Sequence, residues 1–72
     1  MTSSKIFVRL PEEDVDVWRP VWAEKIGVDR FRIVEQPYDR DDERWEFEPG
    51  DEVVCGFVDS DGETLLAATR RP

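Results

Sequence analysis

The amino-acid sequence predicts an all-β fold, a small single-domain barrel of five to six antiparallel strands. Short apolar runs alternate with polar residues at a period of two, which is typical of half-buried strands. Glycine, proline and aspartate separate these runs at short intervals and indicate turns, and no stretch predicts a convincing helix. A chain of this kind is expected to close into a barrel, because closure removes the exposed strand edges that invite aggregation.

A hairpin over residues 15–35 is the predicted element to which the other strands are added. Two apolar-rich runs flank a turn at residues 26–29 that contains a glycine and an aspartate, the local signature of a hairpin. In the run after the turn, Phe31 and Ile33 are expected to point inward, because polar residues alternate with them.

Pro20 makes the first strand of this hairpin ambiguous. In a regular strand Trp18 and Trp22 share one face, and Val21 and Ala23 share the other. A proline inside a run indicates an edge position or a β-bulge. A bulge would shift the alternation by one residue, so the sequence leaves open whether both tryptophans point the same way.

An N-terminal strand is predicted over residues 5–10, with Ile6, Val8 and Leu10 on one face. Pro11 ends this strand because proline has no N–H to donate to a neighbouring strand. An acidic, solvated loop is expected to follow. Its carboxylates are Glu12, Glu13, Asp14 and Asp16.

Three further strands are predicted in the C-terminal half. Trp45 and Phe47 alternate with glutamates and predict a short strand at residues 45–48. Residues 52–58 form the most apolar run, which is typical of a central strand with apolar contacts on both faces, and residues 64–69 form the last strand.

Two turns and one long loop connect these strands. Residues 49–51 (Pro-Gly-Asp) and 59–62 (Asp-Ser-Asp-Gly) contain the residues that tight turns prefer. Residues 36–44 mix charges with proline and tyrosine and show neither a strand nor a helix period, so an exposed loop is expected there.

One domain is expected over residues 1–72, with an ordered core of about 5–69. A single cysteine, Cys55, excludes an internal disulfide, so the three tryptophans, four phenylalanines and one tyrosine are expected to supply a dense core. The sequence lacks the pattern of a secretory leader and any run of roughly 20 apolar residues. Together with the lone cysteine, this predicts a cytoplasmic protein.

The net charge of −8 bears directly on partners. Affinity for nucleic acids comes largely from lysine and arginine that neutralise phosphates, so direct binding to DNA or RNA is disfavoured, as is binding to anionic membranes. A basic protein surface remains a suitable partner, and simple solubility is the plainer explanation of such a charge.

Two motifs carry a family resemblance, DVWRPV at residues 16–21 and WEFEPGD at residues 45–51. With the flanking strands they make nearly the whole chain similar to a group of small, uncharacterised bacterial proteins with an SH3-like barrel. This resemblance implies the barrel fold. It implies no activity, because none is established for that group.

Catalysis and metal binding have little support in the sequence. No histidine is present, which excludes Ser-His and Cys-His pairs and histidine metal ligands. Cys55 lies in an apolar run and is expected to be a core residue rather than a nucleophile. Aligning Gly62 with the invariant glycine of an EF-hand loop places Phe57 and Ala68 where carboxylates are required. We therefore expect no enzyme, no metal and no cofactor.

A protein-interaction surface is the leading functional hypothesis. SH3-like barrels generally bind ligands on aromatic-lined grooves between loops. The alternative is that the aromatic rings pack in the core or at its rim, which is favoured for Trp45 and Trp18 but not for Trp22. Trp22 is therefore the best single candidate, since an exposed tryptophan on a small domain calls for an explanation. The candidate binding residues are Trp18, Trp22, Tyr38, Asp39, Asp41, Asp42 and Glu43. The partner is expected to be a protein, either basic or a second copy of this chain.

The alternative hypothesis is an acidic decoy. Nine acidic residues and two arginines lie between Glu35 and Glu52, and a small acidic barrel could occupy a basic groove that normally holds nucleic acid. Binding of that kind would be fast and sensitive to salt.

Overall fold

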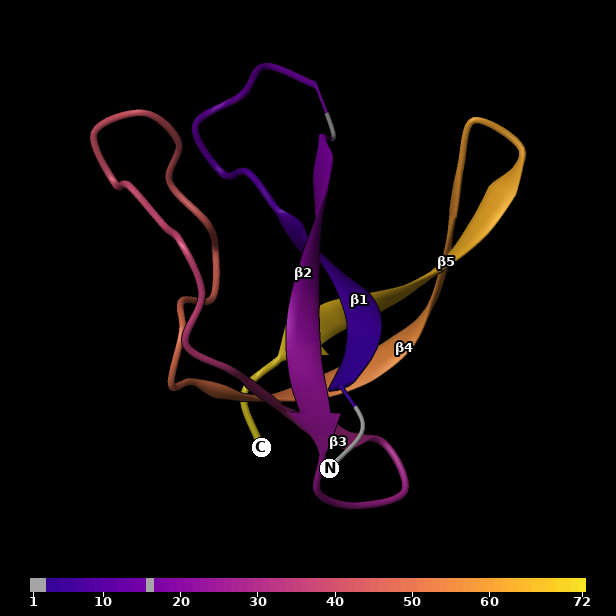
Figure 1. Ribbon diagram of the computed structural model, residues 1–72. Coiled ribbons are helices and arrows are strands. Elements are labelled where there is room, and N and C mark those ends of the chain that lie inside the picture. Colours follow the sequence, from indigo (N-terminus) through magenta and orange to yellow (C-terminus); the bar gives the residue numbers. More distant parts are fainter. Residues whose placement is uncertain (1–2, 16) are drawn as a thin grey trace.

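The computed structural model describes residues 3–15 and 17–72. Over these residues the chain forms five strands and no helix, which confirms the all-β prediction (Figure 1). The strands are β1 (Ser3–Arg9), β2 (Trp18–Lys25), β3 (Arg30–Ile33), β4 (Glu52–Ser60) and β5 (Glu63–Arg70). Asp16, which belongs to the predicted acidic loop and to the first motif, lies outside the described residues.

The strands close into a small barrel in the order β1-β2-β3-β4-β5, consistent with an SH3-like small barrel. Neighbours along the chain pair antiparallel, and β5 meets β1 in parallel through Phe7 and Ala67. The predicted central hairpin corresponds to β2 and β3, joined by a turn at residues 26–29. Because β3 is short, it pairs with only the last residues of β2 and the first residues of β4.

The barrel interior holds the side chains that the alternation predicted to point inward. Ile6, Val8 and Leu10 are buried along β1 and just after it, and Phe31 and Ile33 are buried on β3. The other members of the core cluster are Val21, Ala23, Trp45, Phe47, Val53, Cys55 and Ala68. Burial of this apolar set is the main force that stabilises the barrel.

β2 passes through Pro20 in an unbroken register with β1. The ladder runs from Ser3 opposite Glu24 to Arg9 opposite Trp18, with one residue facing one residue throughout. The alternation of faces is therefore regular, and both tryptophans of β2 point outward. This resolves the ambiguity that the proline leaves in the sequence.

Pro20 is accommodated because its nitrogen faces away from β1. The N–H of Leu10 donates to the Val17 carbonyl at 3.0 Å, and counting back along the antiparallel ladder places Phe7 and Pro20 in a pair that exchanges no hydrogen bonds. Since β3 reaches only the far end of β2, Pro20 also lies on an edge. Its missing N–H leaves the ladder intact.

The predicted strand at residues 45–48 is wrong. These residues lie in the long connection between β3 and β4, where Glu46 and Phe47 form a bend. Trp45 and Phe47 are nevertheless buried, at 6% and 4% exposure, and the N–H of Glu46 donates to the Arg9 carbonyl at 2.9 Å. The alternation thus identified the inward side chains in a segment that has no strand partner.

β4 is central only over its first half. A β-bulge between Val54 and Cys55 allows three consecutive residues from Val53 to be buried. Beyond the bulge, Phe57 is 76% exposed, so the expectation of apolar contacts on both faces is wrong there. The reason is that the β4–β5 hairpin continues past the point where β3 ends.

Both predicted tight turns are present. Pro49 and Gly50 occupy the centre of a turn closed by the Asp51 N–H, which donates to the Glu48 carbonyl at 3.0 Å, and Gly50 has the positive φ of 94° that a type II turn requires. Asp61 and Gly62, with φ of 49° and 81°, make the two-residue turn between β4 and β5.

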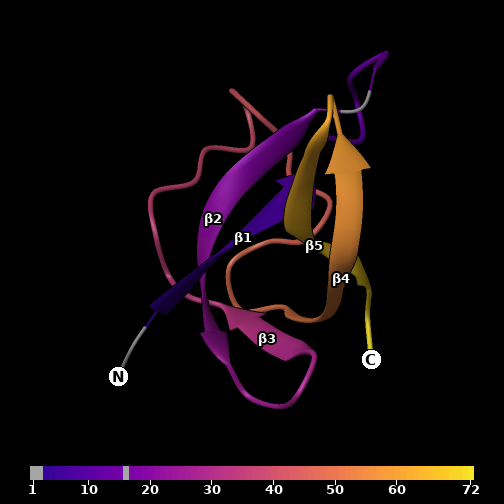
Figure 2. The same cartoon turned by 90° about the vertical axis from the view of Figure 1, so that its right-hand side faces the viewer.

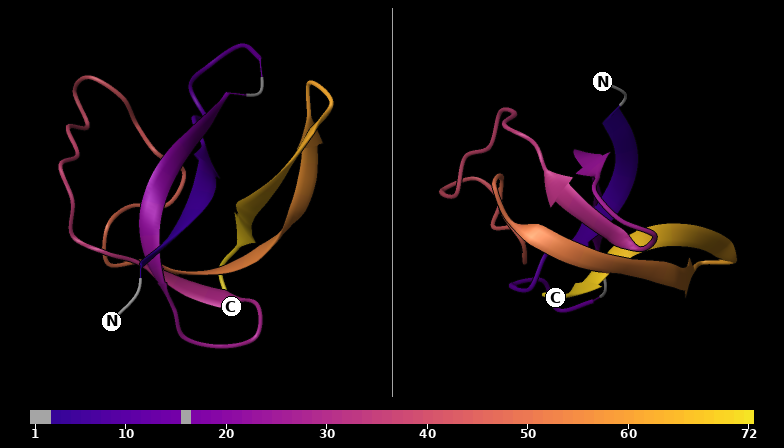
Figure 3. Two further views of the ribbon diagram at one scale, coloured as in Figure 1. Left: turned by 45° about the vertical axis from the view of Figure 1, so that its right-hand side comes forward. Right: turned by 90° about the horizontal axis from the view of Figure 1, so that it is seen from below.

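The connection from β1 to β2 and the tip of the β4–β5 hairpin project from the same end of the barrel (Figures 1 and 2). The start of β1 and the C-terminus lie toward the opposite end (Figure 3). The projecting end therefore brings together two segments that are far apart in the sequence.

Candidate functional site

The structure divides the predicted site residues between two places. Trp18 and Trp22 lie on the outer face of β2. The other candidates belong to the loop at residues 36–44, which is part of the connection between β3 and β4. They are Tyr38, Asp39, Asp41, Asp42 and Glu43.

A groove opens beside Trp18, between the β1–β2 connection and the tip of the β4–β5 hairpin. It has two lobes of about 590 and 610 Å³, which share Val15, Trp18, Ser60 and Asp61. The remaining lining residues are Phe7, Val17, Val58, Asp59, Glu63 and Leu65. We call this the hairpin groove. Trp18 is the one predicted site residue that lines it.

Apolar side chains form part of the walls of the hairpin groove, beside the polar residues of the hairpin tip. Val15 is 69% exposed, and Phe7, Trp18, Val58 and Leu65 are each half-buried, so a partner can reach apolar surface on both sides. Burial of such surface contributes about 25 cal/mol per Å². Apolar side chains that gather at an exposed surface mark an interaction site more often than isolated ones do.

Carboxylates border the groove at the hairpin tip. Asp59, Asp61 and Glu63 are exposed, and among the described residues none of them forms an ion pair. Asp59 accepts one weak hydrogen bond, from the Thr64 hydroxyl at 3.3 Å. The tip therefore presents negative charge that no described cation balances.

Trp22 lies on the same outer face as Trp18 and is 52% exposed. Its backbone is held by Gln36: the Trp22 N–H donates to Gln36 Oε1 at 3.0 Å, and Gln36 Nε2 donates to the Trp22 carbonyl at 2.9 Å. Gln36 thereby occupies the open edge of β2 as a neighbouring strand would. The Trp22 ring stays exposed over a fixed backbone, as a contact residue needs.

Glu43 connects the loop at residues 36–44 to β2. Its Oε1 accepts the indole N–H of Trp45 at 2.9 Å and lies 3.3 Å from Nε of Arg19. These residues help to line a separate cavity of about 350 Å³, together with Tyr38, Asp39, Asp42 and Pro37. We call it the loop cavity.

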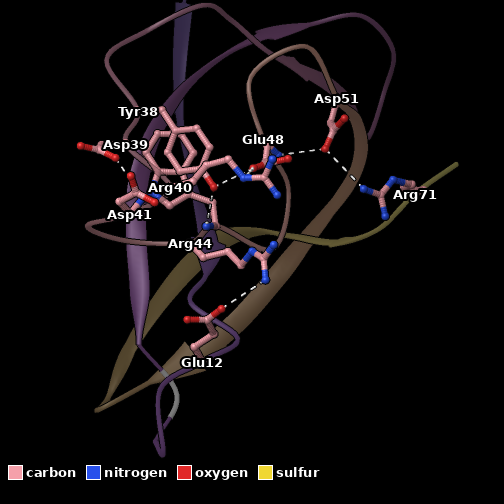
Figure 4. Close-up of polar contacts among 10 residues, drawn as sticks. Glu12, Tyr38, Asp39, Arg40, Asp41, Arg44, Glu48, Asp51 and Arg71 are labelled. Atoms are coloured by element: carbon pink, nitrogen blue, oxygen red, sulfur yellow. Dashed lines mark hydrogen bonds and ion pairs between the residues drawn. The ribbon is translucent and has the colours of Figure 1, made fainter.

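Tyr38 holds the loop together. Its hydroxyl donates to Glu48 Oε2 at 2.8 Å (Figure 4). The same hydroxyl accepts the Trp45 N–H at 3.1 Å, and the ring centroids of Tyr38 and Trp45 lie 4.4 Å apart. Burial raises the pKa of Tyr38, while the hydrogen bond from Trp45 opposes that rise. The hydroxyl and the ring of Tyr38 both contact neighbouring residues of the same connection, and these contacts support a structural role.

The aspartates of the loop organise its backbone. Asp39 Oδ1 accepts the Asp41 N–H at 2.9 Å, and the Asp39 carbonyl accepts the N–H groups of Asp42 and Glu43 at 3.1 and 3.0 Å. Asp41 and Asp42 remain exposed.

Arginines balance much of the charge around this loop. Arg40 lies 3.0 Å from Glu48, and Arg44 lies 3.3 Å from Glu12 of the β1–β2 connection (Figure 4). Both arginines belong to the loop but pair with glutamates outside it, and among the described residues Glu43 is the only acid of the loop in an ion pair, with Arg19.

Cys55 is buried in the core cluster, as the sequence predicts. Burial, reinforced by the Asp29 carboxylate, raises the pKa of its thiol to about 11. A protonated, enclosed thiol is a poor nucleophile.

The described residues contain no group of three or more His, Cys, Asp or Glu side chains placed to hold a metal ion. They also contain no helix of the length and apolar character that a membrane crossing requires. No protein-family model, no curated protein and no solved structure matches this chain.

Proposed function

We propose that this protein is a non-catalytic interaction module that binds a segment of another protein in the hairpin groove. The observation that carries the proposal is the groove itself, where apolar side chains around Trp18 meet carboxylates of the hairpin tip that form no ion pair with a described residue. Interfaces typically combine a central aromatic contact with a polar rim, and this arrangement offers both.

Trp22 extends the same surface along β2. It lies four residues from Trp18 on the outer face, with the exposed ring of Pro20 between them. A partner that fills the groove and continues along β2 meets all three rings. The partner fitting this surface has apolar side chains for the groove and basic side chains for the tip.

An acidic decoy is the second candidate. The net charge of −8 and the exposed Asp41 and Asp42 favour it. The arginines that neutralise Glu12, Glu43 and Glu48 weaken it, because a mimic of nucleic acid needs an uninterrupted run of charge.

We also propose that the chain belongs to the group of small bacterial SH3-like barrels that its two motifs resemble, and that it acts in the cytoplasm. The closed barrel and the buried free cysteine support these assignments.

A pull-down from lysate of the source organism tests the two candidates. The baits are the wild type, Trp18→Ala, Trp22→Ala and the double variant Asp41→Asn/Asp42→Asn. Val28→Ala is the matched control, because Val28 is 93% exposed and lies on the β2–β3 turn outside the groove.

The interaction module predicts a partner that the wild type and Val28→Ala retain at high salt and that Trp18→Ala loses. A basic partner released by salt from every bait, and bound weakly by Asp41→Asn/Asp42→Asn, would favour the decoy. A partner indifferent to all four variants would contradict both candidates.

A further inference from the structure

The second half of β4 has one edge with no neighbouring strand among the described residues. Within the described residues β4 pairs with β3 only at residues 52–54, whereas its pairing with β5 continues to Ser60 opposite Glu63. The N–H of Cys55 donates to the Asp29 carbonyl at 2.8 Å, where the β2–β3 turn reaches β4. Residues 56–60 then continue as one arm of the projecting hairpin (Figure 1). We call this side of the arm the β4 edge.

Hairpin geometry determines which backbone groups point away from β5. Ser60 and Glu63 flank the two-residue turn and form a hydrogen-bonded pair. The alternation makes Val58 part of the next such pair and leaves Phe57 and Asp59 in pairs that exchange no hydrogen bonds. The N–H and C=O groups of Phe57 and Asp59 therefore point out from the β4 edge, free of bonds to other described backbone groups.

Side chains beside the β4 edge suit a bound strand. Phe57 is 76% exposed, and Val58 and Asp59 line a lobe of the hairpin groove with Val15 and Trp18. A strand on this edge would thus place side chains against apolar surface while its backbone bonds to β4. Recognition by strand addition works in this way, with affinity from main-chain hydrogen bonds and specificity from side-chain contacts.

We propose that the β4 edge accepts an extended segment of a partner protein as an added strand, and that this segment alternates basic and apolar residues. The inference rests on the proposed function, since the hairpin groove supplies the apolar contacts. Charge selects the occupant. Asp59, Asp61 and Glu63 attract lysine and arginine, and a second copy of this chain, with its own net charge of −8, is repelled.

The test uses short synthetic peptides in which Lys or Arg alternates with Val, Leu or Phe, with binding followed by isothermal calorimetry and by NMR of the labelled protein. A matched panel carries N-methyl groups on alternate amides, which removes backbone donors and leaves the side chains unchanged. A third panel replaces the basic residues with Glu.

Two protein variants distinguish the contribution of the Asp59 carboxylate from that of its backbone N–H. Asp59→Asn removes the carboxylate and keeps the N–H, whereas Asp59→Pro removes both. Proline is tolerated here because the Asp59 N–H points away from β5. Asp59→Pro should weaken binding at least about tenfold beyond Asp59→Asn.

Support for strand addition consists of binding by a basic panel member, its loss on N-methylation, and slower amide exchange at Phe57 and Asp59 in the complex. Equal affinity for plain and N-methylated peptides would overturn it, and that readout does not depend on how well Asp59→Pro folds. If the Glu peptides bind more tightly than the basic ones, or if no peptide binds, the basic segment is not the occupant.

Failure of this inference is distinguishable from failure of the proposed function. If N-methylation has no effect while Trp18→Ala still abolishes binding, the groove binds a segment without adding a strand. If light scattering shows a dimer that Asp59→Pro dissociates, the β4 edge takes a second copy and the assigned partner is wrong.

Discussion

The side chain of Gln36 takes the place of a neighbouring strand beside Trp22. It forms hydrogen bonds with the N–H and C=O of Trp22 and with the carbonyl of Val34. Gln36→Ala should lower the free energy of unfolding by about 1 kcal/mol, since water replaces part of what is lost at this exposed edge. The Trp22 amide should also exchange faster. Urea titration and hydrogen exchange measure both effects, with Glu35→Ala as the neighbouring control. An unchanged Trp22 exchange rate would contradict the role assigned to Gln36.

The raised pKa of Cys55 should make the free energy of unfolding depend on pH in the alkaline range. The thiol has an ordinary pKa of 9.0 and a folded-state pKa of about 11. Between these values the unfolded chain releases a proton that the folded chain retains. The free energy of unfolding therefore falls as the pH rises, by at most about 1.4 kcal/mol per pH unit.

Urea titrations of wild type and Cys55→Ala from neutral pH to pH 11 check this slope. The variant should be less stable at neutral pH, because a buried sulfur is lost, yet it should decline less with pH. The raised pKa of Tyr38 adds a decline of the same sign at the upper end of the range in both proteins. Parallel curves would contradict the assignment to Cys55.

The connection between β3 and β4 is an element of the core although it has no strand. Trp45→Ala should cost about 3–5 kcal/mol, because Trp45 is 6% exposed, whereas Trp22→Ala at 52% exposure should cost less than about 1 kcal/mol. A domain of this length has a total stability of about 4–11 kcal/mol, so Trp45→Ala approaches unfolding. Chemical denaturation of the two variants makes the comparison, and similar losses would show that the connection does not close the core.

At the scale of the whole molecule, charge repulsion should oppose folding. The chain has 18 acidic and 10 basic residues, and the ion pairs between described residues join partly exposed side chains, each worth little. NaCl reduces the screening length from about 10 Å at 0.1 M to about 3 Å at 1 M, against a molecule 34 Å in its longest dimension. The melting temperature should therefore rise with NaCl.

The triple variant Asp59→Asn/Asp61→Asn/Glu63→Gln is the control for this effect. It makes the net charge of −8 less negative by three units and removes no described ion pair, so its melting temperature should respond less to salt. A wild-type melting temperature that falls with NaCl would show that the surface ion pairs outweigh the repulsion.

Local alternation and the conformational needs of residues such as Gly50 and Gly62 were enough to predict the segments of β1 to β5, most of their inward residues and the two tight turns. The sequence also favoured an exposed Trp22 and a buried Cys55, and both are observed. These are properties of single residues and their near neighbours along the chain.

The site could be located in the tertiary structure but not in the sequence. The hairpin groove joins Val15 and Trp18 to the tip of the β4–β5 hairpin, and no local pattern states that these segments meet. Likewise, Phe57 belongs to an apolar run yet is exposed because β3 ends before it, and the two arginines of the loop pair with Glu12 and Glu48 from other segments. Burial, edge exposure and ion pairing depend on contacts between segments that are distant in the sequence, and these contacts form only when the barrel closes.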